Sequence, residues 1–516
     1  MKRTIPSSET LTWTLFVVLA LAIAAAPVAV SLLYSSKYDL LYVPIASWFV
    51  FVLVGSALTL GGIAGYWLWS RLRRTSQELA GLTGQPIDGE IPVVRGHRHV
   101  EKAEFLTIIQ ALFKPFPDVR YIQVKPLPGG YGGSTTVSAK LRREQGDPPL
   151  PRSFVIKLGD RREMAGEHEK FHEYVEWRLT RRNWAMFLGY AEWEDWAGIA
   201  YEFAGLDPAH EIQSFYQFYK GHATVEVSKL VEEIYSHLRQ AWYRNGQQDS
   251  KNIYHEYGIL NKKQMLIIEH VGEIVDQDDP YRRNFTIVEK KIQPNLKPSF
   301  CPAMDIPWRD PVGFLRVWPR KDLHVPIHRS VVHGDLHARN ILVEIGRDGR
   351  KQPWFIDFSH TGNGLSRART DEAAREGALI DKDRGHTLRD FSRLEADVKF
   401  VLTGLRDEDD LGRAVAFEKE LLACGMEMHD LQVESPHTEA LLDERFRKAW
   451  QVIGEIRRQA VKYLTNPGDL RPYHLSLLHA TLPIVYYHPD QFEDETCERQ
   501  QKRYALISAG MLCDQL

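Results

Sequence analysis

Cysteine is scarce in this sequence, and neither sign of charge is in large excess. Four cysteines occur among 516 residues, without CxxC spacing: Cys301, Cys424, Cys497 and Cys513. Such usage provides no framework for disulfide bonds or a zinc site and is typical of a reducing compartment. The formal net charge is -3 and no long basic run is present, so we expect no nucleic-acid partner.

Charged residues are absent from two long stretches near the beginning of the chain. Leu11–Tyr34 and Leu40–Ser70 contain none, and each is longer than the roughly 20 residues that cross a bilayer as a helix. They predict a transmembrane hairpin within residues 1–74, with spans at about 11–34 and 42–70. The lipid bilayer is therefore an expected partner.

The charges that flank this hairpin indicate its orientation. Lys2 and Arg3 precede the first span, and three arginines follow the second: Arg71, Arg73 and Arg74. The positive-inside rule then places both ends of the hairpin in the cytoplasm. We expect a multi-pass protein of the inner or plasma membrane whose remaining domains are cytoplasmic. A cleaved signal peptide is the alternative interpretation of the first stretch, and the second stretch close behind it favours the hairpin.

The rest of the chain is long enough for two or three folding units. We expect a juxtamembrane linker over residues 75–99. Residues 100–205 then predict a β-rich lobe in the order helix, strand, glycine-rich turn, two strands, helix, two strands. Residues 206–329 have a helical pattern at first and are then irregular. Residues 330–516 begin with a loop and continue with amphipathic helical patterns.

One loop carries a dense set of reactive side chains. His333, Asp335 and Asn340 lie between apolar runs in SVVHGDLHARNILVE, and Asp357 ends the next apolar run in WFIDF. Phosphoryl transfer needs one carboxylate to meet an acceptor hydroxyl, and an amide oxygen and a second carboxylate to hold Mg²⁺. The five-residue step from Asp335 to Asn340 also matches the spacing of a kinase catalytic loop.

These motifs, HGDLHARN and IDF, resemble those of the aminoglycoside phosphotransferase and choline kinase branch of the protein-kinase-like fold. The wording HGDLHARN and IDFSHTG also resembles the predicted phosphotransferases of bacterial ternary conflict systems. The resemblance implies an α+β, bilobal protein-kinase-like fold after the hairpin, with a small β-rich N-lobe and a large, mainly helical C-lobe. It also implies ATP and Mg²⁺ as cofactors, with Asp335 at the acceptor hydroxyl and with Asp357 and Asn340 as Mg²⁺ ligands.

Upstream residues complete the expected nucleotide site. A glycine-rich turn lets the backbone approach phosphates, and its glycines are Gly129, Gly130, Gly132 and Gly133. Lys157 lies in an apolar strand, where a charge is costly without a partner. The resemblance implies that this lysine contacts the α and β phosphates and pairs with a helix glutamate. Glu167 is favoured because it shares a helical stripe with Phe171 and Val175, and Glu169 is the alternative.

Several neighbouring residues keep more than one interpretation. His333 follows two valines, which favours a buried histidine that braces the loop. His337 and Arg339 either contact the loop backbone or a phosphate, or face solvent. Asp390 resembles the aspartate that anchors a kinase catalytic loop through backbone N–H groups, with an ordinary helix-surface aspartate as the alternative. Ser359 replaces the glycine of DFG, as expected for the small-molecule branch.

Together these residues predict a membrane-anchored, ATP- and Mg²⁺-dependent phosphotransferase. It would act on a hydroxyl of an unidentified, small acceptor, whose pocket we expect in residues 206–329. One alternative is a non-catalytic nucleotide-binding sensor or scaffold that signals through the hairpin or a protein partner. A second is a metal-dependent hydrolase that uses His333, Asp335 and His337, with His360 or Asp357 completing the metal site.

Overall fold

The computed structural model describes most of the chain beyond residue 101. The described residues are 87–89, 102–116, 118–126, 134–147, 154–179, 184, 186–202, 211–257, 286–288, 291–293, 299–301, 306–308, 311, 314, 324–367, 370–371, 381–426 and 443–516. All of them fall in the second of the chain's two compact units, Gly84–Leu516. Among them, no helix is both long enough and apolar enough to span a bilayer. The predicted hairpin and the glycine-rich turn lie outside the described residues.

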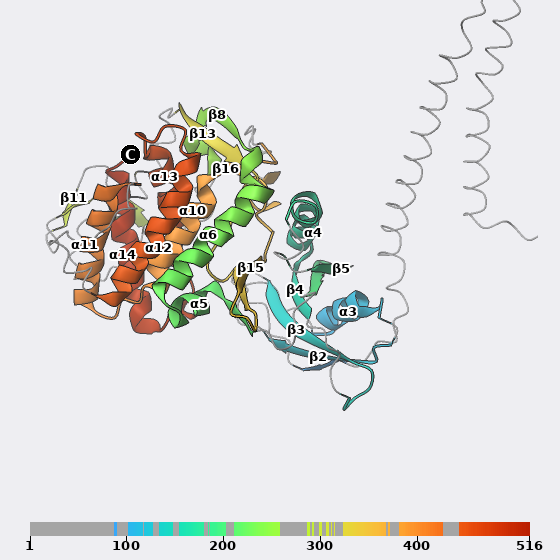
Figure 1. Ribbon diagram of the computed structural model, residues 1–516. Coiled ribbons are helices and arrows are strands. Elements are labelled where there is room, and N and C mark those ends of the chain that lie inside the picture. The colour runs from blue at the N-terminus through green and yellow to red at the C-terminus, as the bar shows by residue number, and fades with distance from the viewer. Residues whose placement is uncertain are drawn as a thin grey trace, which may run out of the picture. The chain divides into compact units, whose positions relative to one another are not determined.

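A six-stranded sheet forms the N-terminal part of this unit, with the order β1-β2-β3-β4-β6-β5 (Figure 1). Its strands are β1 (Ile87–Gly89), β2 (Tyr121–Pro126), β3 (Thr135–Arg142), β4 (Phe154–Asp160), β5 (Met186–Trp193) and β6 (Trp196–Glu202). β1 pairs in parallel with β2, and the other neighbours are antiparallel. Strands β2 to β6 occur in the predicted order. β1 lies inside the segment that we expected to be a linker, so this segment contributes to the sheet.

Two helices cover opposite faces of the sheet. α3 (Lys102–Phe113) packs on β5 and β6, and α4 (Arg161–Lys170) packs on β4 and β6. Neighbouring side chains of a strand point to opposite faces, and β4 uses both. Its apolar residues Phe154, Ile156 and Leu158 join the core beneath α3. Lys157 therefore points to the opposite face, where α4 lies.

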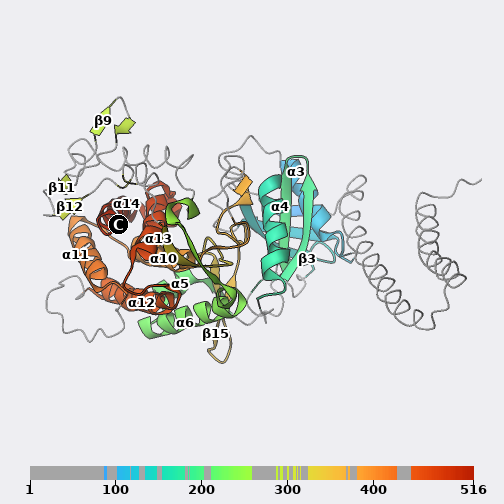
Figure 2. The same ribbon diagram turned by 90° about the horizontal axis from the view of Figure 1, so that it is seen from above.

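The C-terminal part consists of a body of helices flanked by two three-stranded sheets (Figures 1 and 2). One sheet has the order β16-β13-β8, from β8 (Gln247–Asn252), β13 (His324–Ser330) and β16 (Gly385–His386). The other has the order β15-β14-β7, from β7 (Glu211–Ser214), β14 (Ile341–Ile345) and β15 (Lys351–Phe355). Two short antiparallel pairs complete the described strands: β9 (Thr286–Val288) with β10 (Lys291–Gln293), and β11 (Ser299–Cys301) with β12 (Ile306–Trp308).

The helices of this part are α5 (Phe215–Gly221), α6 (Thr224–Ala241), α10 (Leu388–Asp397), α11 (Glu408–Cys424), α12 (Glu444–Ala460), α13 (Arg471–Thr481) and α14 (Glu495–Cys513). The 3₁₀ segments are Tyr243–Asn245, Ile253–Glu256, Val461–Tyr463, Leu482–Tyr486 and Pro489–Gln491. Two segments are π-helical: Val398–Leu402 follows α10 in this part, and Phe171–Val175 follows α4 in the N-terminal part. The α+β architecture is thus confirmed.

Helix α10 occupies the centre of the helical body, where it packs on both α12 and α13. The sequence predicts this helix from its apolar face, and Leu388, Phe391 and Leu394 are all fully buried or nearly so. The remainder of the predicted stretch continues as the π-helical turn Val398–Leu402. A helix buried on this scale is a rigid base, and its side chains Asp390, Arg393 and Asp397 contact the loop that carries Asp335.

The segment that follows the N-terminal sheet differs from its predicted form at one point. We expected helix from residue 212, but residues 211–214 form β7 and pair with β14. The four residues are too few for a periodicity to be read, and their structure is set by the hydrogen bonds of the neighbouring strand. The segment therefore contributes an edge strand to the sheet that follows the catalytic loop motif.

Candidate active site

Lys157 and Glu167 form a buried ion pair between β4 and α4. Lys157 Nζ lies 2.8 Å from Glu167 Oε2, and Glu167 Oε1 accepts a 2.8 Å hydrogen bond from the hydroxyl of Tyr201. Glu169, the alternative partner, instead pairs with Arg367. The predicted pairing of Lys157 with Glu167 is present, and its role in binding a nucleotide stays a prediction.

The same lysine reaches the IDF motif. Lys157 Nζ lies 2.7 Å from Asp357 Oδ1, so one ammonium group bridges two carboxylates that are distant in the sequence. Burial lowers the pKa of Lys157, but the carboxylates of Asp357 and Glu167 outweigh burial and raise the pKa above its ordinary value. The lysine is therefore cationic, which is the state that attracts phosphate oxygens.

The backbone of the HGD motif is fastened to α10 by Asp390. Its two carboxylate oxygens accept hydrogen bonds from the backbone N–H groups of His333 and Gly334, each 2.8 Å long. Tyr243 donates a third bond of 2.7 Å to the same carboxylate. Asp390 is fully buried. The anchoring role is confirmed, and the helix-surface interpretation of Asp390 is wrong.

Gly334 can only be glycine in this loop. Its φ is +85°, a backbone conformation that side-chain-bearing residues rarely adopt, and an added Cβ would lie 2.5 Å from the carbonyl oxygen of His360. The tight approach brings the loop after IDF against the HGD motif. This contact explains why glycine stands between His333 and Asp335.

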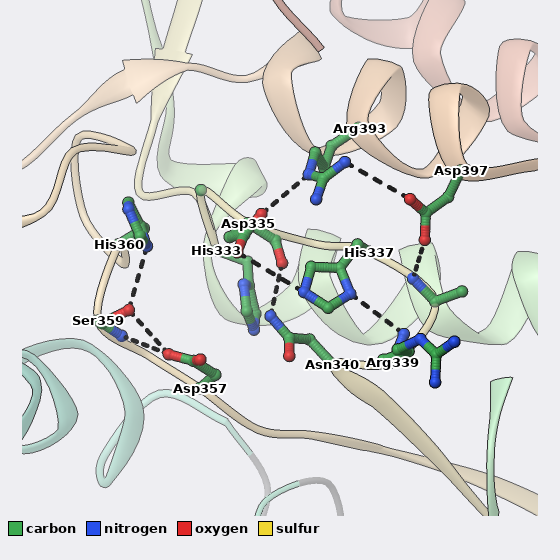
Figure 3. A network of polar contacts seen from close by, with 12 residues as sticks. His333, Asp335, His337, Arg339, Asn340, Asp357, Ser359, His360, Arg393 and Asp397 are labelled. Carbon is green, nitrogen blue, oxygen red and sulfur yellow. Dashed lines mark hydrogen bonds and ion pairs between the residues drawn. The ribbon is translucent and has the colours of Figure 1, made fainter. Parts of the chain in front are cut away.

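Asp335 is held by an arginine of α10. Arg393 Nε donates a 2.8 Å hydrogen bond to Asp335 Oδ1, while Oδ2 lies 3.7 Å from His337 Nε2, as Figure 3 shows. Arg393 is also 3.5 Å from Asp397, which accepts a 2.7 Å bond from the backbone N–H of Ala338. Both the side chain and the backbone of the loop are thus fixed to one helix.

The arginine also determines the charge state of Asp335. Burial raises the pKa of this carboxyl, but Arg393, and after it His337 and His360, outweigh burial and hold the pKa well below its ordinary value. Asp335 is therefore an ionised acceptor for a hydroxyl hydrogen.

Strand pairing brings Asn340 and Asp357 together. β14 and β15 are antiparallel, with Ile341 opposite Phe355, and the backbone N–H of Ile356 donates a 3.1 Å bond to the carbonyl of Asn340. The residue that ends the HGDLHARN motif therefore lies next to the strand that leads into Asp357. The two motifs become neighbours through the sheet rather than through their sequence.

Asp357 sits in an unusual backbone conformation and is oriented by Ser359. Its φ is +62°, in the left-handed region that non-glycine residues seldom occupy. Ser359 Oγ donates a 2.7 Å bond to Asp357 Oδ1. Burial raises the pKa of Asp357, but Lys157 and Ser359 outweigh burial, and the pKa falls below its ordinary value. The serine that replaces the glycine of DFG thus contributes a hydrogen bond to the carboxylate.

The donor set fits a magnesium ion. Asn340 Nδ2 donates a 2.9 Å bond to the carbonyl of Asp335, which leaves the amide oxygen of Asn340 as the atom available to a cation. Asp357 supplies an ionised carboxylate whose side chain is 30% exposed. Mg²⁺ takes oxygen ligands and is usually held by one or two protein groups together with phosphates and water.

The alternative metal site around the histidines is not formed. His333 is fully buried, and its Nε2 lies 3.1 Å from the carbonyl oxygen of Ile356. His360 Nδ1 instead lies 3.1 Å from Ser359 Oγ. Within the described ranges, which include all the proposed ligands, no group of three or more His, Cys, Asp or Glu side chains could hold a metal. The metal-cluster interpretation is therefore wrong, and the bracing role of His333 is confirmed.

Arg339 and His337 have structural contacts. Arg339 lies over the ring of Tyr216 at 4.5 Å and donates 3.3 Å bonds to the carbonyls of Asp490 and Gln491. His337 Nδ1 accepts a 3.2 Å bond from the backbone N–H of Arg339. Arg339 thus connects the loop to the C-terminal region.

Two residues of the site were not assigned from the sequence: Arg393, and Asp397, whose role was left open. Asp390, Arg393 and Asp397 follow one another at spacings of three and four residues, so they share one face of α10. That spacing was visible in the sequence. It did not indicate that this face meets the loop that carries Asp335, because the partners are 57 to 59 residues earlier and are fixed only by packing.

Comparisons with known proteins give one family match and a distant structural match. Residues 120–273 match the family model described as ternary complex associated domain 9, a segment that contains Lys157 and Glu167 but ends before Asp335. No curated protein sequence matches the chain. A crystal structure of spectinomycin phosphotransferase, APH(9)-Ia, in complex with ADP and spectinomycin is similar at 10% sequence identity and a TM-score of 0.27, over 76% of this chain and 93% of that one. Residues 120–273 are thus similar to ternary complex associated domain 9, which supports the resemblance to proteins of ternary conflict systems drawn from the sequence.

Proposed function

We propose that this chain is an ATP-dependent phosphotransferase that transfers the γ-phosphoryl group to a hydroxyl of a small acceptor. One observation carries the proposal: two ionised carboxylates, one amide oxygen and one lysine, from three separate segments, converge on a single site. Asp335, Asn340, Asp357 and Lys157 are these groups. Positioning and electrostatic stabilisation account for most of the catalysis of phosphoryl transfer, so this small set suffices.

Each group has a definite task in this proposal. Lys157 neutralises charge on the nucleotide phosphates and is itself held by Glu167. Asp335 accepts the hydroxyl hydrogen of the acceptor through Oδ2, since Oδ1 is occupied by Arg393. Asp357 and Asn340 would hold a Mg²⁺ ion, which neutralises developing charge on the phosphoryl group when it is bound.

The proposal includes attachment to a membrane. The charge-free stretches at residues 11–34 and 42–70 support a hairpin of two spanning helices. The flanking basic residues support a location of the catalytic domain in the cytoplasm, where ATP is available. Labelling of cysteines introduced at residue 37 and residue 75 in intact cells would test this orientation, with only residue 37 expected to react from outside.

The test of catalysis uses the full chain in detergent and its Asp335→Asn variant. We expect transfer of labelled phosphate from ATP into a small molecule of a cell extract, with a rate about 10²- to 10⁴-fold lower in the variant. Binding of Mg-ATP should be retained, because Asp335 faces the acceptor rather than the nucleotide. Equal nucleotide binding without transfer by either protein would instead identify a sensor or scaffold.

A further inference from the structure

A pair of histidines that the phosphotransferase site does not use lies on α4 and on the π-helical segment Phe171–Val175 that continues it. His168 Nε2 and His172 Nε2 face each other at 3.0 Å. On the far side of its ring, His172 Nδ1 lies 2.5 Å from Glu176 Oε2. Histidine, histidine and glutamate therefore form a line of side chains along one face of this helical segment, beside β5.

The helix geometry keeps these three residues in line. In a regular α-helix, residues four apart drift by about 40° around the axis. Here the helix changes from α to π at Phe171–Val175, and the wider π turn offsets that drift. Such single π turns occur frequently at functional sites. The distortion thus aligns His168, His172 and Glu176.

Aromatic rings fix the orientation of the histidines. The ring of His168 is stacked on Tyr190, with 4.8 Å between centroids and 3° between planes. It also stacks on Phe187 at 5.0 Å, which meets His172 edge-on at 4.9 Å. Rings held in this way lose little conformational entropy when they bind a ligand.

The carboxylate of Glu176 sets the tautomer of His172. A carboxylate that accepts from Nδ1–H leaves Nε2 as a lone-pair donor, and a carboxylate on the far nitrogen is the usual support of a metal-bound histidine. Two imidazoles on a tetrahedral Zn²⁺ have nitrogens about 3.3 Å apart, given bonds of about 2.0–2.1 Å. The observed 3.0 Å needs only a slight opening of the pair.

We propose that His168 and His172 bind a divalent transition metal that prefers imidazole, Zn²⁺ foremost, with Glu176 supporting His172. Within the described residues no third His, Cys, Asp or Glu completes the set, so the remaining positions of the ion are open to water. The side chains of His172 and Glu176 are each 26% exposed, which leaves a path for the ion. The bound ion cross-links the last turn of α4 to the π-helical segment that follows it.

The experiment is a titration of the full chain with Zn²⁺ against a chromophoric chelator, in excess Mg²⁺ so that the oxygen ligands of Asn340 and Asp357 are occupied. We expect one equivalent of Zn²⁺ and a rise in Tm on binding. His168→Ala and His172→Ala should lose both effects. Glu176→Gln should weaken binding about 10- to 100-fold.

Two control variants distinguish this site from Zn²⁺ binding elsewhere on the chain. His324→Ala removes an exposed histidine of β13 and should bind Zn²⁺ like the parent, as should Asp357→Asn. Circular dichroism without metal confirms that each variant is folded, and a misfolded alanine variant is replaced by His172→Gln. Unchanged stoichiometry in the His168 and His172 variants, or no Zn²⁺ bound by the parent chain, overturns the proposal.

Discussion

Arg393 Nε lies 2.8 Å from Asp335 Oδ1, so a side chain of α10 binds one of the two oxygens of the carboxylate that we propose to meet the acceptor. The same helix holds the loop backbone through Asp390 and Asp397. One face of α10 therefore fixes both the backbone of the loop and the side-chain orientation of Asp335. Only Oδ2 of Asp335 is left to meet an acceptor.

The first prediction concerns this contact. Arg393→Ala should lower kcat about 100-fold with a small change in the KM for ATP, because a misplaced reactive group has a cost of this order. Arg393→Lys, which keeps the charge, should recover part of kcat. Steady-state kinetics with varied ATP and varied acceptor measures the change in kcat separately from the change in each KM. Arg458→Ala, at a half-exposed arginine of α12, is the control, and an equal loss of kcat there would contradict the positioning role.

Gly334 gives a prediction about stability. Gly334→Ala combines a positive φ with a collision against the backbone of His360, so the loop must move. Gly349 has a similar φ of +75° but nothing within 4 Å of an added Cβ. Gly349→Ala should cost about 1–2 kcal/mol of unfolding free energy, and Gly334→Ala clearly more, with loss of phosphate transfer. Urea unfolding of both variants measures the two losses of unfolding free energy. Equal losses would show that the structure relieves the contact between the added Cβ and the backbone of His360.

Glu167 gives a prediction about nucleotide binding. Glu167→Gln removes one of the two carboxylates that hold Lys157 and leaves the lysine to Asp357 alone. We expect a rise of about 10-fold in the Kd for Mg-ATP, equivalent to about 1.4 kcal/mol. Glu169→Gln is the matched control, because Glu169 is 62% exposed and pairs with Arg367. Isothermal titration calorimetry measures both, and a larger effect at Glu169 would reassign the partner.

Buried histidines predict acid sensitivity. Burial lowers the pKa of His479 to about 3 and of His474 to about 4, whereas an unfolded histidine has its ordinary value of 6.5. Between these values the unfolded chain binds more protons than the folded one, so stability falls as the pH drops below about 6.5. The slope is about 1.4 kcal/mol per pH unit for each histidine.

His479→Phe should make this decline shallower. Both ring nitrogens of His479 lack a hydrogen-bond partner among the described residues, and the ring stacks on Tyr257 at 4.5 Å, so phenylalanine can take its place. Urea unfolding at pH 7.5, 6.5 and 5.5 gives the slopes. The exposed His324→Phe should leave the slope unchanged, and a slope in His479→Phe equal to the parent's would refute the assignment.

Much of the site was predictable because phosphoryl transfer constrains residue types at short spacings. Asp335 and Asn340 are five residues apart on one loop, and their proximity follows from that spacing. Lys157 in an apolar strand predicts a buried partner, and Glu167 was identified from its helical stripe. The succession of β2 to β6 along the chain followed from alternation in the same way. Each of these is a local pattern.

Other features needed the fold. Arg393 had no signal that linked it to Asp335, and the strand formed by residues 211–214 has no periodicity of its own. The pair of His168 and His172 is visible as a spacing of four residues, but its alignment with Glu176 depends on a π turn that the sequence pattern did not predict.

The sequence by itself determined the chemical groups, the order of the strands and the helix that carries Glu167, since these depend on side-chain chemistry and on periods of two and 3.6 residues. Tertiary structure decided which groups meet: Lys157 with Asp357, Asp390 with the backbone of His333, and Arg393 with Asp335. These contacts join segments up to 200 residues apart, and their geometry is set by packing of the whole core rather than by any local pattern.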